Sequence, residues 1–307
     1  MGVSTAQNHV ICQSYTCPAC ADAIVHSGGT PVIVDVETET FSLSLDAVEC
    51  ALEKDSNIVG ILVVSCYGIP GRDLHAIRRL CDKRHLWLLE DNCESYGAES
   101  AGVPVGCIGE MSVLSVRSEK LIGAGEGGAI MSNNRDLINR ARWWCSRAAA
   151  QSGRLWEKYF HEAVGQNYLM PELVAAVALA GAESLPNVIA KKREINSWYR
   201  QHFSQCQTPT SADQGVFWIN AVRLPIPAEA VGMELIRRCP GIEIRPGFYP
   251  LHQQPPFGEC SRNQSCPNAE TLFKHVICLP SSVRLAREDV EYICKNLQDV
   301  IAEIKAG

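Results

Sequence analysis

Six short strand-like segments lie in the first 132 residues, several of them continuous apolar runs rich in Val, Ile and Leu, and helix-like segments lie between them. Such runs are typical of strands that are buried on both faces of a mainly parallel sheet. The predicted strands are His9–Gln13, Pro31–Val36, Ile58–Ser65, Leu86–Glu90, Met111–Ser115 and Gly128–Ser132, and the predicted helices are Pro18–Ser27, Ser44–Lys54, Leu74–Arg84 and Arg135–Ala149. This alternation of strands and helices predicts a three-layer α/β domain.

The second half of the chain has a different pattern and predicts a smaller α+β domain. Its predicted elements are a helical stretch over Pro171–Leu185 and Ile189–Phe203, broken near Pro186, then a polar spacer Gln207–Gly215, a strand Val216–Arg223, a helix Ala228–Arg238, a short strand Ile242–Arg245, a loop Pro246–Pro267, a strand Val276–Leu279 and a closing helix Ala286–Lys305. We expect the boundary between Ala150 and Pro171, which divides the chain into residues 1–160 and 161–307.

Composition narrows the class of protein. The chain has 307 residues, of which 46% are hydrophobic, so a sizeable core is available. A net charge of -6 with scattered Lys and Arg gives no reason to expect nucleic acid or an anionic membrane as a partner. No apolar run approaches the ~20 residues that a membrane span needs, and the N-terminus lacks the pattern of a signal peptide. We therefore expect a cytoplasmic protein that binds neither membranes nor nucleic acid.

The fifteen cysteines favour reduced thiols over a disulfide framework, because disulfide-dense proteins are mostly small and secreted. Several of them, such as Cys12 and Cys278, sit in apolar patterns where cysteine behaves as a small buried hydrophobe. The alternative is a redox or zinc motif at Cys17-Pro18-Ala19-Cys20, which follows a predicted strand. One CxxC is a weak signal, and zinc would need two further ligands. We expect no metal site.

Two charged residues follow predicted strands and point to one site. Asp91 comes at the end of the apolar run from Leu86, and Lys120 follows another strand and precedes the glycine-rich Gly123–Gly128. Ligands of such sheets bind outside the carboxyl ends of the strands, where Ser65–Gly68 supplies a third edge. A lysine that bonds to an aldehyde and a carboxylate that keeps a pyridine nitrogen protonated are the pairing that a pyridoxal phosphate enzyme needs.

The order and spacing of several motifs resemble the DegT/StrS-type sugar aminotransferases, a fold-type-I group of pyridoxal phosphate-dependent enzymes. The resemblance rests on Thr30–Val36, Cys66–Gly68 with Pro70, Glu90–Ala98, Ser115–Gly128, Gly165–Pro171, Lys191–Glu194 and Tyr249–His252. It implies an aspartate aminotransferase-like large domain. It also implies a transaminase of the perosamine-synthase kind, acting on a nucleotide-linked keto sugar with an amino donor such as glutamate.

The resemblance assigns roles to individual residues. Lys120 matches the lysine that forms the internal aldimine with the cofactor and then moves the α-proton. Asp91 matches the carboxylate that faces the pyridine nitrogen, Glu94 falls near the 3-hydroxyl, and Ser115 corresponds to a serine that binds the phosphate. Asn167 corresponds to an asparagine that reaches the phosphate in the neighbouring subunit, which implies a homodimer with shared active sites.

Other residues are assigned to the substrate side with alternatives left open. Arg117 suits a phosphate because its guanidinium is bidentate, and a structural salt bridge is the equal alternative. Tyr249 and His252 match a segment near the substrate opening, and the alternative for His252 is a loop histidine without a ligand. Glu126-Gly127-Gly128 is expected to act through its backbone, since glycine permits positive φ.

The sequence departs from the family pattern in two places. Family members normally have some tens of residues before the segment that here starts at His9, including a loop at a helix start that binds the phosphate. Met1–Asn8 is too short to supply both, so the large domain is expected to be N-terminally shortened. Cys17 takes the place of an aromatic residue that stacks on the cofactor, and Tyr15, two residues away, is expected to compensate.

Two readings of function therefore remain. The first is an active aminotransferase whose cofactor is held by Lys120, Asp91, Ser115 and the partner's Asn167. The alternative is an N-terminally truncated or degenerate, non-catalytic family member that acts as an oligomerisation or regulatory subunit. A dehydratase relative is disfavoured, because such relatives carry His where this chain has Lys120.

Overall fold

The computed structural model describes residues 8–150, 153–203, 215–258, 260 and 265–306. Its centre is a six-stranded sheet of order β2-β1-β3-β4-β7-β8, in which all neighbours are parallel except β7 and β8. The strands are β1 (His9–Gln13), β2 (Thr30–Val34), β3 (Ile58–Val64), β4 (Trp87–Asp91), β7 (Met111–Ser115) and β8 (Gly128–Met131). Each predicted strand of the first half is present, with bounds shifted by at most two residues.

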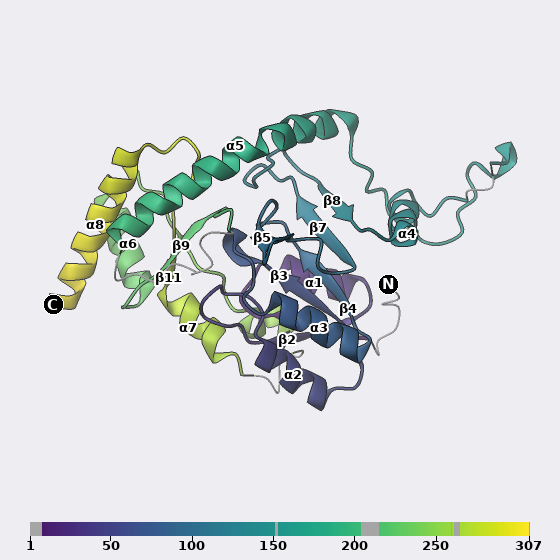
Figure 1. Cartoon of the computed structure of the whole chain (residues 1–307), viewed down its shortest axis with the longest axis horizontal. Coiled ribbons are helices and arrows are strands. Elements are labelled where there is room, and N and C mark those ends of the chain that lie inside the picture. Colours follow the sequence, from purple (N-terminus) through teal and green to yellow (C-terminus); the bar gives the residue numbers. More distant parts are fainter. Residues whose placement is uncertain (1–7, 151–152, 204–214, 259, 261–264, 307) are drawn as a thin grey trace.

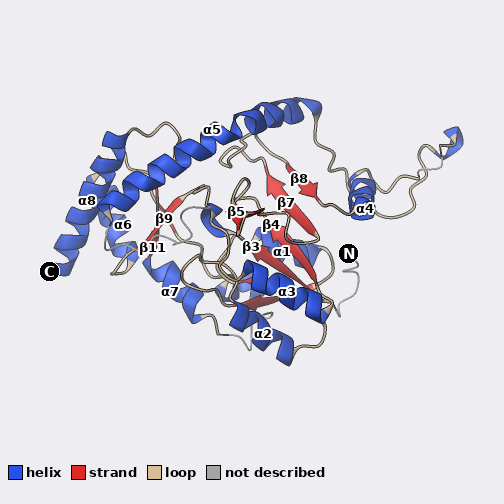
Figure 2. Cartoon of the chain, in the orientation of Figure 1, coloured by secondary structure: helices blue, strands red, loops and turns tan. Residues whose placement is uncertain are grey.

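Helices cover both faces of this sheet (Figures 1 and 2). Successive strand residues point to opposite faces, so Ile11 and Ile61 pack beneath α2 (Leu45–Lys54) and α3 (Leu74–Arg84). Cys12 and Leu62 point to the other face, which is covered by α1 (Ala19–His26). The predicted three-layer architecture is confirmed, and it places the carboxyl ends of the parallel strands along one edge.

An extended arm follows α4 (Arg135–Cys145) and reaches away from the sheet (Figure 1). The prediction that this helix continues to Ala149 is wrong, because Arg147 and Ala148 adopt left-handed φ values of 65° and 51°. The arm contains the short helix η2 (Leu155–Glu157), and an isolated bridge joins Ser146 to Asn167. Its aromatic side chains are exposed, with Trp156 96% accessible.

Helix α5 (Glu172–His202) is one continuous helix of 31 residues, so the predicted break near Pro186 is wrong. Proline removes one intrahelical hydrogen bond, but packing on either side of it keeps the helix intact. Leu185 is buried against the large core, whereas Ile195 and Tyr199 are buried in a second cluster. The helix therefore runs from one sheet to the other (Figure 1).

The second cluster contains an antiparallel sheet of order β10-β11-β9, packed against α5, α6 and α8. Its elements are β9 (Asn220–Arg223), α6 (Ala228–Arg238), β10 (Arg245–Pro246), β11 (Val276–Leu279) and α8 (Arg287–Ala306). Strand β9 starts four residues later than predicted, and β10 shares only Arg245 with the predicted strand Ile242–Arg245. Most of the predicted spacer, residues 207–214, lies outside the described residues.

A helix that the sequence pattern missed, α7 (Pro267–His275), ties the end of the chain to its beginning. The Asp35 carboxylate accepts hydrogen bonds from the backbone N–H of Asn268 at 3.0 Å and of Ala269 at 2.9 Å. This is helix capping by a residue more than 230 positions away. The remaining short elements are η1 (Cys66–Gly68), β5 (Glu99–Ser100), β6 (Val103–Pro104), η3 (Leu251–Gln253) and η4 (Pro255–Phe257).

Candidate active site

Two consecutive acids at the end of β4 serve different purposes. Glu90 is buried and accepts hydrogen bonds from the backbone N–H groups of Gly106, Ile108 and Gly109, at 2.8, 2.7 and 2.6 Å. Because strand side chains alternate, Asp91 points the other way, toward the layer of α1. Glu90 therefore holds the following loop in place, and Asp91 is left for the carboxyl edge of the sheet.

The Asp91 carboxylate is positioned by groups from its own turn and from α1. One oxygen accepts the backbone N–H of Cys93 at 3.0 Å, and the other accepts the thiol of Cys20 at 3.2 Å. Burial raises the pKa of the Cys20 thiol, and the neighbouring Asp91 carboxylate raises it further. Cys20 is thus a neutral donor to Asp91, which is a different role from that of a reactive thiol in a redox motif.

Lys120 lies in the loop between β7 and β8, and backbone hydrogen bonds close this loop. The N–H of Val116 donates to the Gly127 carbonyl at 3.0 Å, and the N–H of Ser118 donates to the Gly125 carbonyl at 2.9 Å. Gly125 and Gly127 have φ values of +96° and +133°, which other residues rarely adopt. The backbone role expected for this glycine-rich segment is therefore present in the fold.

The Lys120 side chain is held between a carboxylate and an aromatic face, and only 11% of it is exposed. Its Nζ lies 3.4 Å from Oε1 of Glu94 and 3.6 Å from the ring centroid of Trp218. The structure thus brings Lys120 and Glu94 into direct contact.

Glu94 links Lys120 to the turn after β3. Its second oxygen, Oε2, accepts the backbone N–H of Tyr67 at 2.8 Å. Burial raises the pKa of the Glu94 carboxyl group, the Lys120 ammonium opposes that rise, and the Asp91 carboxylate adds to it. Asp91, Glu94 and Lys120 therefore form one electrostatically coupled group at the carboxyl edge of the sheet.

The remaining predicted residues of the Lys120 loop bond within the loop itself. The hydroxyl oxygen of Ser115 accepts the backbone N–H of Arg117 at 3.2 Å. The Arg117 guanidinium is 56% exposed and lies 3.4 Å from Glu119 and 3.5 Å from Glu126. Of the two alternatives for Arg117, the structure contains the ion pairs.

Three predicted residues lie in other parts of the fold. Asn167 is exposed in the arm, where it bridges to Ser146. His252 contacts the Ser14 hydroxyl at 2.7 Å and the Glu270 carboxylate at 3.1 Å. The Tyr249 ring packs edge-to-face on Phe273 with the two centroids 4.7 Å apart. Both Tyr249 and His252 thus contact α7.

The expectation that Tyr15 replaces the missing aromatic stack is wrong. Tyr15 is fully buried, its ring packs edge-on against Phe41, Tyr67 and Phe248, and its hydroxyl lies 3.1 Å from that of Tyr67. Strand β1 ends at Gln13, so the two-residue alternation does not extend to this segment. The ring is part of the core and has no free face.

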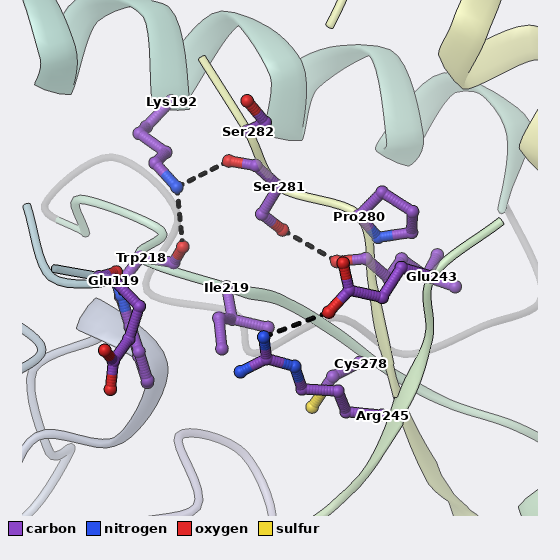
Figure 3. A pocket seen from close by; sticks show the side chains of 11 residues that line it. Glu119, Lys192, Trp218, Ile219, Glu243, Arg245, Cys278, Pro280, Ser281 and Ser282 are labelled. Atoms are coloured by element: carbon purple, nitrogen blue, oxygen red, sulfur yellow. Dashed lines mark hydrogen bonds and ion pairs between the residues drawn. The ribbon is translucent and has the colours of Figure 1, made fainter. Parts of the chain in front are cut away.

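Trp218 is the main site residue that sequence reasoning missed. It lies 98 positions after Lys120, and no local pattern connects the two residues. Its indole N–H donates to the Glu119 carbonyl at 2.6 Å, so the ring is fixed to the residue before the lysine. Beside it is a cavity of about 290 Å³ (Figure 3). The cavity is lined by Glu119, Lys192, Trp218, Ile219, Glu243, Arg245, Cys278, Leu279, Pro280, Ser281 and Ser282.

The donor set at the sheet edge fits the ring portion of pyridoxal phosphate. Lys120 supplies a primary amine, and Asp91 and Glu94 supply carboxylates that can pair with ring substituents. The hydroxyls of Ser115, at the end of β7, and of Ser118, in the loop of the amine, bond to the backbone of this segment: Ser115 accepts the Arg117 N–H, and Ser118 donates to the Gly125 carbonyl. Among the described residues no cluster of three or more His, Cys, Asp or Glu side chains has the arrangement of a metal site.

A family model and individual relatives of this sequence all point to the same protein family. The model of the DegT/DnrJ/EryC1/StrS aminotransferase family matches residues 1–298. A GDP-perosamine synthase of Escherichia coli O157:H7 is 31% identical over 306 residues, which cover 99% of this chain and 81% of that protein. A UDP-N-acetyl-3-dehydro-alpha-D-glucosamine 3-aminotransferase of Acidithiobacillus ferrooxidans is 27% identical over 93% of this chain and 76% of that protein.

Solved structures agree with the sequence relatives. The aminotransferase TlmJ of Streptoalloteichus hindustanus superimposes with a TM-score of 0.87 at 25% identity, over 98% of this chain and 81% of that chain. DesV of S. venezuelae, solved with a ketimine intermediate, has a TM-score of 0.86 at 26% identity, over 97% and 79% of the two chains. The chain therefore belongs to the DegT/DnrJ/EryC1/StrS aminotransferase family, whose members are pyridoxal phosphate-dependent transaminases.

Proposed function

We propose that this protein is a pyridoxal phosphate-dependent aminotransferase that acts on a nucleotide-linked keto sugar, with an amino acid such as glutamate as the donor. The observation that carries the proposal is the coupled group of Lys120, Glu94 and Asp91 at the carboxyl edge of the sheet. The substrate class is supported by two relatives, a GDP-perosamine synthase and an aminotransferase of a UDP-linked sugar.

Each residue of this group has a defined task. When bound, pyridoxal phosphate supplies an aldehyde that captures amines and a ring that accepts electrons. Lys120 would supply the amine that holds the aldehyde, and the same amine would move a proton to and from the substrate carbon. Asp91 would keep the ring nitrogen protonated, and Cys20 and the Cys93 N–H fix the orientation of the Asp91 carboxylate.

Glu94 is the proton partner of Lys120. An ammonium cannot attack an aldehyde, so Lys120 must first lose a proton. Glu94 Oε1 lies 3.4 Å from the Lys120 Nζ and would accept this proton, since burial raises the pKa of the Glu94 carboxyl group. The low exposure of both side chains keeps bulk water from this exchange.

We further propose a homodimer in the cytoplasm with shared active sites. The first half of α5 carries an exposed apolar surface made of Leu173, Val177 and Leu179, and Leu173 is 84% exposed. By length and composition α5 is apolar enough to cross a membrane, but a single such helix is weak evidence. A second copy of the chain would cover this apolar surface of α5. Asn167 in the arm of one copy would then reach the cofactor phosphate of the other.

The test is covalent capture of the cofactor. Protein saturated with pyridoxal phosphate is reduced with borohydride, and the modified peptide is identified by mass spectrometry. We expect the label on Lys120, its loss in Lys120→Ala, and its retention in the control Lys191→Ala, because Lys191 is only half-buried and pairs with Glu194. Absence of the label in the wild-type chain would favour the alternative, a non-catalytic oligomerisation or regulatory subunit.

A further inference from the structure

The cavity beside Trp218 lies next to the Lys120 loop and has no role in the function proposed so far. Trp218, whose ring lies 3.6 Å from the Lys120 Nζ, and Glu119, the residue before Lys120, both line it. Its volume of about 290 Å³ is at the lower limit of ligand sites, which span roughly 300–1,000 Å³. The cavity therefore suits a molecule of amino-acid size and is too small for a nucleotide-linked sugar.

A buried cation, Lys192, lines this cavity. It projects from α5 and donates hydrogen bonds to the carbonyls of Trp218 at 2.7 Å and of Ser281 at 2.5 Å (Figure 3). Only 8% of Lys192 is exposed. The two bonds use two of the three N–H groups of the ammonium, so the third can serve a further acceptor.

Lys192 is buried without a carboxylate beside it. Lys120 has Glu94 at 3.4 Å, whereas no acidic side chain of the described residues forms an ion pair with Lys192. Burial lowers the pKa of Lys192, and no neighbouring acid opposes this effect. A buried charge is costly unless an opposite charge lies nearby. An anion in the cavity would supply that charge.

The other charged groups of the cavity are exposed and carry both signs. Arg245, at the start of β10, pairs with Glu243 at 3.0 Å, and Glu119 approaches from the Lys120 loop (Figure 3). The pair with Glu243 occupies only the Nη2 nitrogen of Arg245, which leaves other N–H groups of the guanidinium for a ligand. The lining thus offers one cation inside, a second cation at the opening, and acids that can receive an ammonium.

We propose that this cavity binds an α-amino acid with an acidic side chain. One carboxylate of the ligand pairs with Lys192 inside the cavity and the second with Arg245 at the opening, while Glu119 receives the ammonium. The choice of glutamate as the probe rests on the proposed function, whose amino donor belongs to this class. The site itself rests on the cavity and its charges.

Isothermal titration calorimetry with L-glutamate measures this binding. The borohydride-reduced protein is used, because reduction fixes the cofactor on Lys120 and prevents transamination. We expect Lys192→Met to weaken the affinity by at least about tenfold, as loss of a hydrogen bond from a charged group implies. Wild-type protein that does not bind glutamate, or a Lys192→Met variant that binds it as wild-type protein does, would overturn the proposal.

Arg245→Gln keeps the test decisive if Lys192→Met folds poorly, because it leaves Lys192 and its two carbonyl bonds in place. It should weaken glutamate binding by about threefold, as an exposed charge contact implies, and leave L-glutamine, which lacks the second carboxylate, unaffected. 2-Oxoglutarate lacks the ammonium and should bind more weakly than glutamate. Equal affinity for 2-oxoglutarate and glutamate would contradict the assignment of an amino acid.

Each of the two variants has a matched control. Lys191 is the neighbour of Lys192 on α5 and pairs with Glu194 at 2.7 Å, and Arg237 on α6 pairs with Glu234 at 2.7 Å. Lys191→Met and Arg237→Gln should both retain the wild-type affinity, and equal weakening in a variant and its control would contradict the site. If the borohydride capture fails, the proposed function is refuted, and the same titrations on untreated protein still decide whether the cavity binds glutamate.

Discussion

At the scale of single residues, the buried cation of Lys192 makes stability depend on pH. Burial lowers the pKa of Lys192 from 10.5 to about 8, so the unfolded chain binds this proton more tightly than the folded one. The cost to stability is fully present below pH 8 and disappears as pH rises toward 10.5, the opposite sign from a lysine that gains a carboxylate partner.

We therefore expect the free energy of unfolding of wild-type protein to rise, relative to Lys192→Met, by about 1–2 kcal/mol between pH 7.5 and 9.5. The full shift corresponds to roughly 3 kcal/mol, and the two carbonyl acceptors, which stabilise the charged form, reduce it. Urea unfolding at three pH values measures the difference. A gap that stays constant with pH would show that Lys192 titrates in the folded protein as it does in the unfolded chain.

At this same scale the sequence was informative about charged residues and uninformative about their neighbours. Lys120 and Asp91 could be placed at one edge because each follows an apolar run that had to be a strand. Trp218 could not be placed, because its contact with Lys120 depends on how α5 and the loops around β9 and β11 close over the large sheet. Tyr15 was misplaced because strand alternation was extended beyond the end of β1.

At the scale of secondary-structure elements, Pro186 is a built-in weakness of α5. A proline in a helix interior removes a hydrogen bond and typically costs about 3 kcal/mol relative to alanine. Because α5 is held on both sides of Pro186, we expect Pro186→Ala to raise the free energy of unfolding by about 1–3 kcal/mol. Ser184→Ala, an exposed change half a turn away, is the control and should change it by less than about 0.5 kcal/mol. A destabilised Pro186→Ala variant would mean that the helix requires a local distortion at the proline.

The sequence pattern predicts the strands of the large sheet but misses helix α7, and the two cases differ for a physical reason. Buried parallel strands are visible as apolar runs whatever their partners, and all five were found, together with the exposed antiparallel strand β8. Helix α7 begins with Pro267 at its first turn, a genuine start signal, but a short helix of nine residues carries little periodicity. Its N-terminus is capped by Asp35, and a contact across that separation is not visible in the local sequence pattern.

At the scale of the whole molecule, the proposed homodimer should depend on the exposed apolar surface of α5, made of Leu173, Val177 and Leu179. We expect Leu173→Glu to convert a dimer into a monomer, because it places a charge in an apolar interface. Met233→Glu on α6, also an exposed apolar residue, should leave the dimer intact. Sedimentation velocity at micromolar concentration distinguishes the outcomes, and a wild-type monomer, or a dimer that survives Leu173→Glu, would contradict the assignment of this surface.

The division into residues 1–160 and 161–307 stays a prediction, since α5 packs into both clusters.

The bonds from Asp35 to α7 and from Ser14 to His252 also bear on the order of events during folding. Both join residues more than 230 positions apart. The carboxyl ends of β1 and β2 are therefore covered only after nearly the whole chain is available. Contacts of such separation close slowly, because the intervening chain must lose its conformational freedom first. During synthesis the first strands can pair while this edge is still open, and the environment of Lys120 is completed only once Trp218, 98 positions later, has been made.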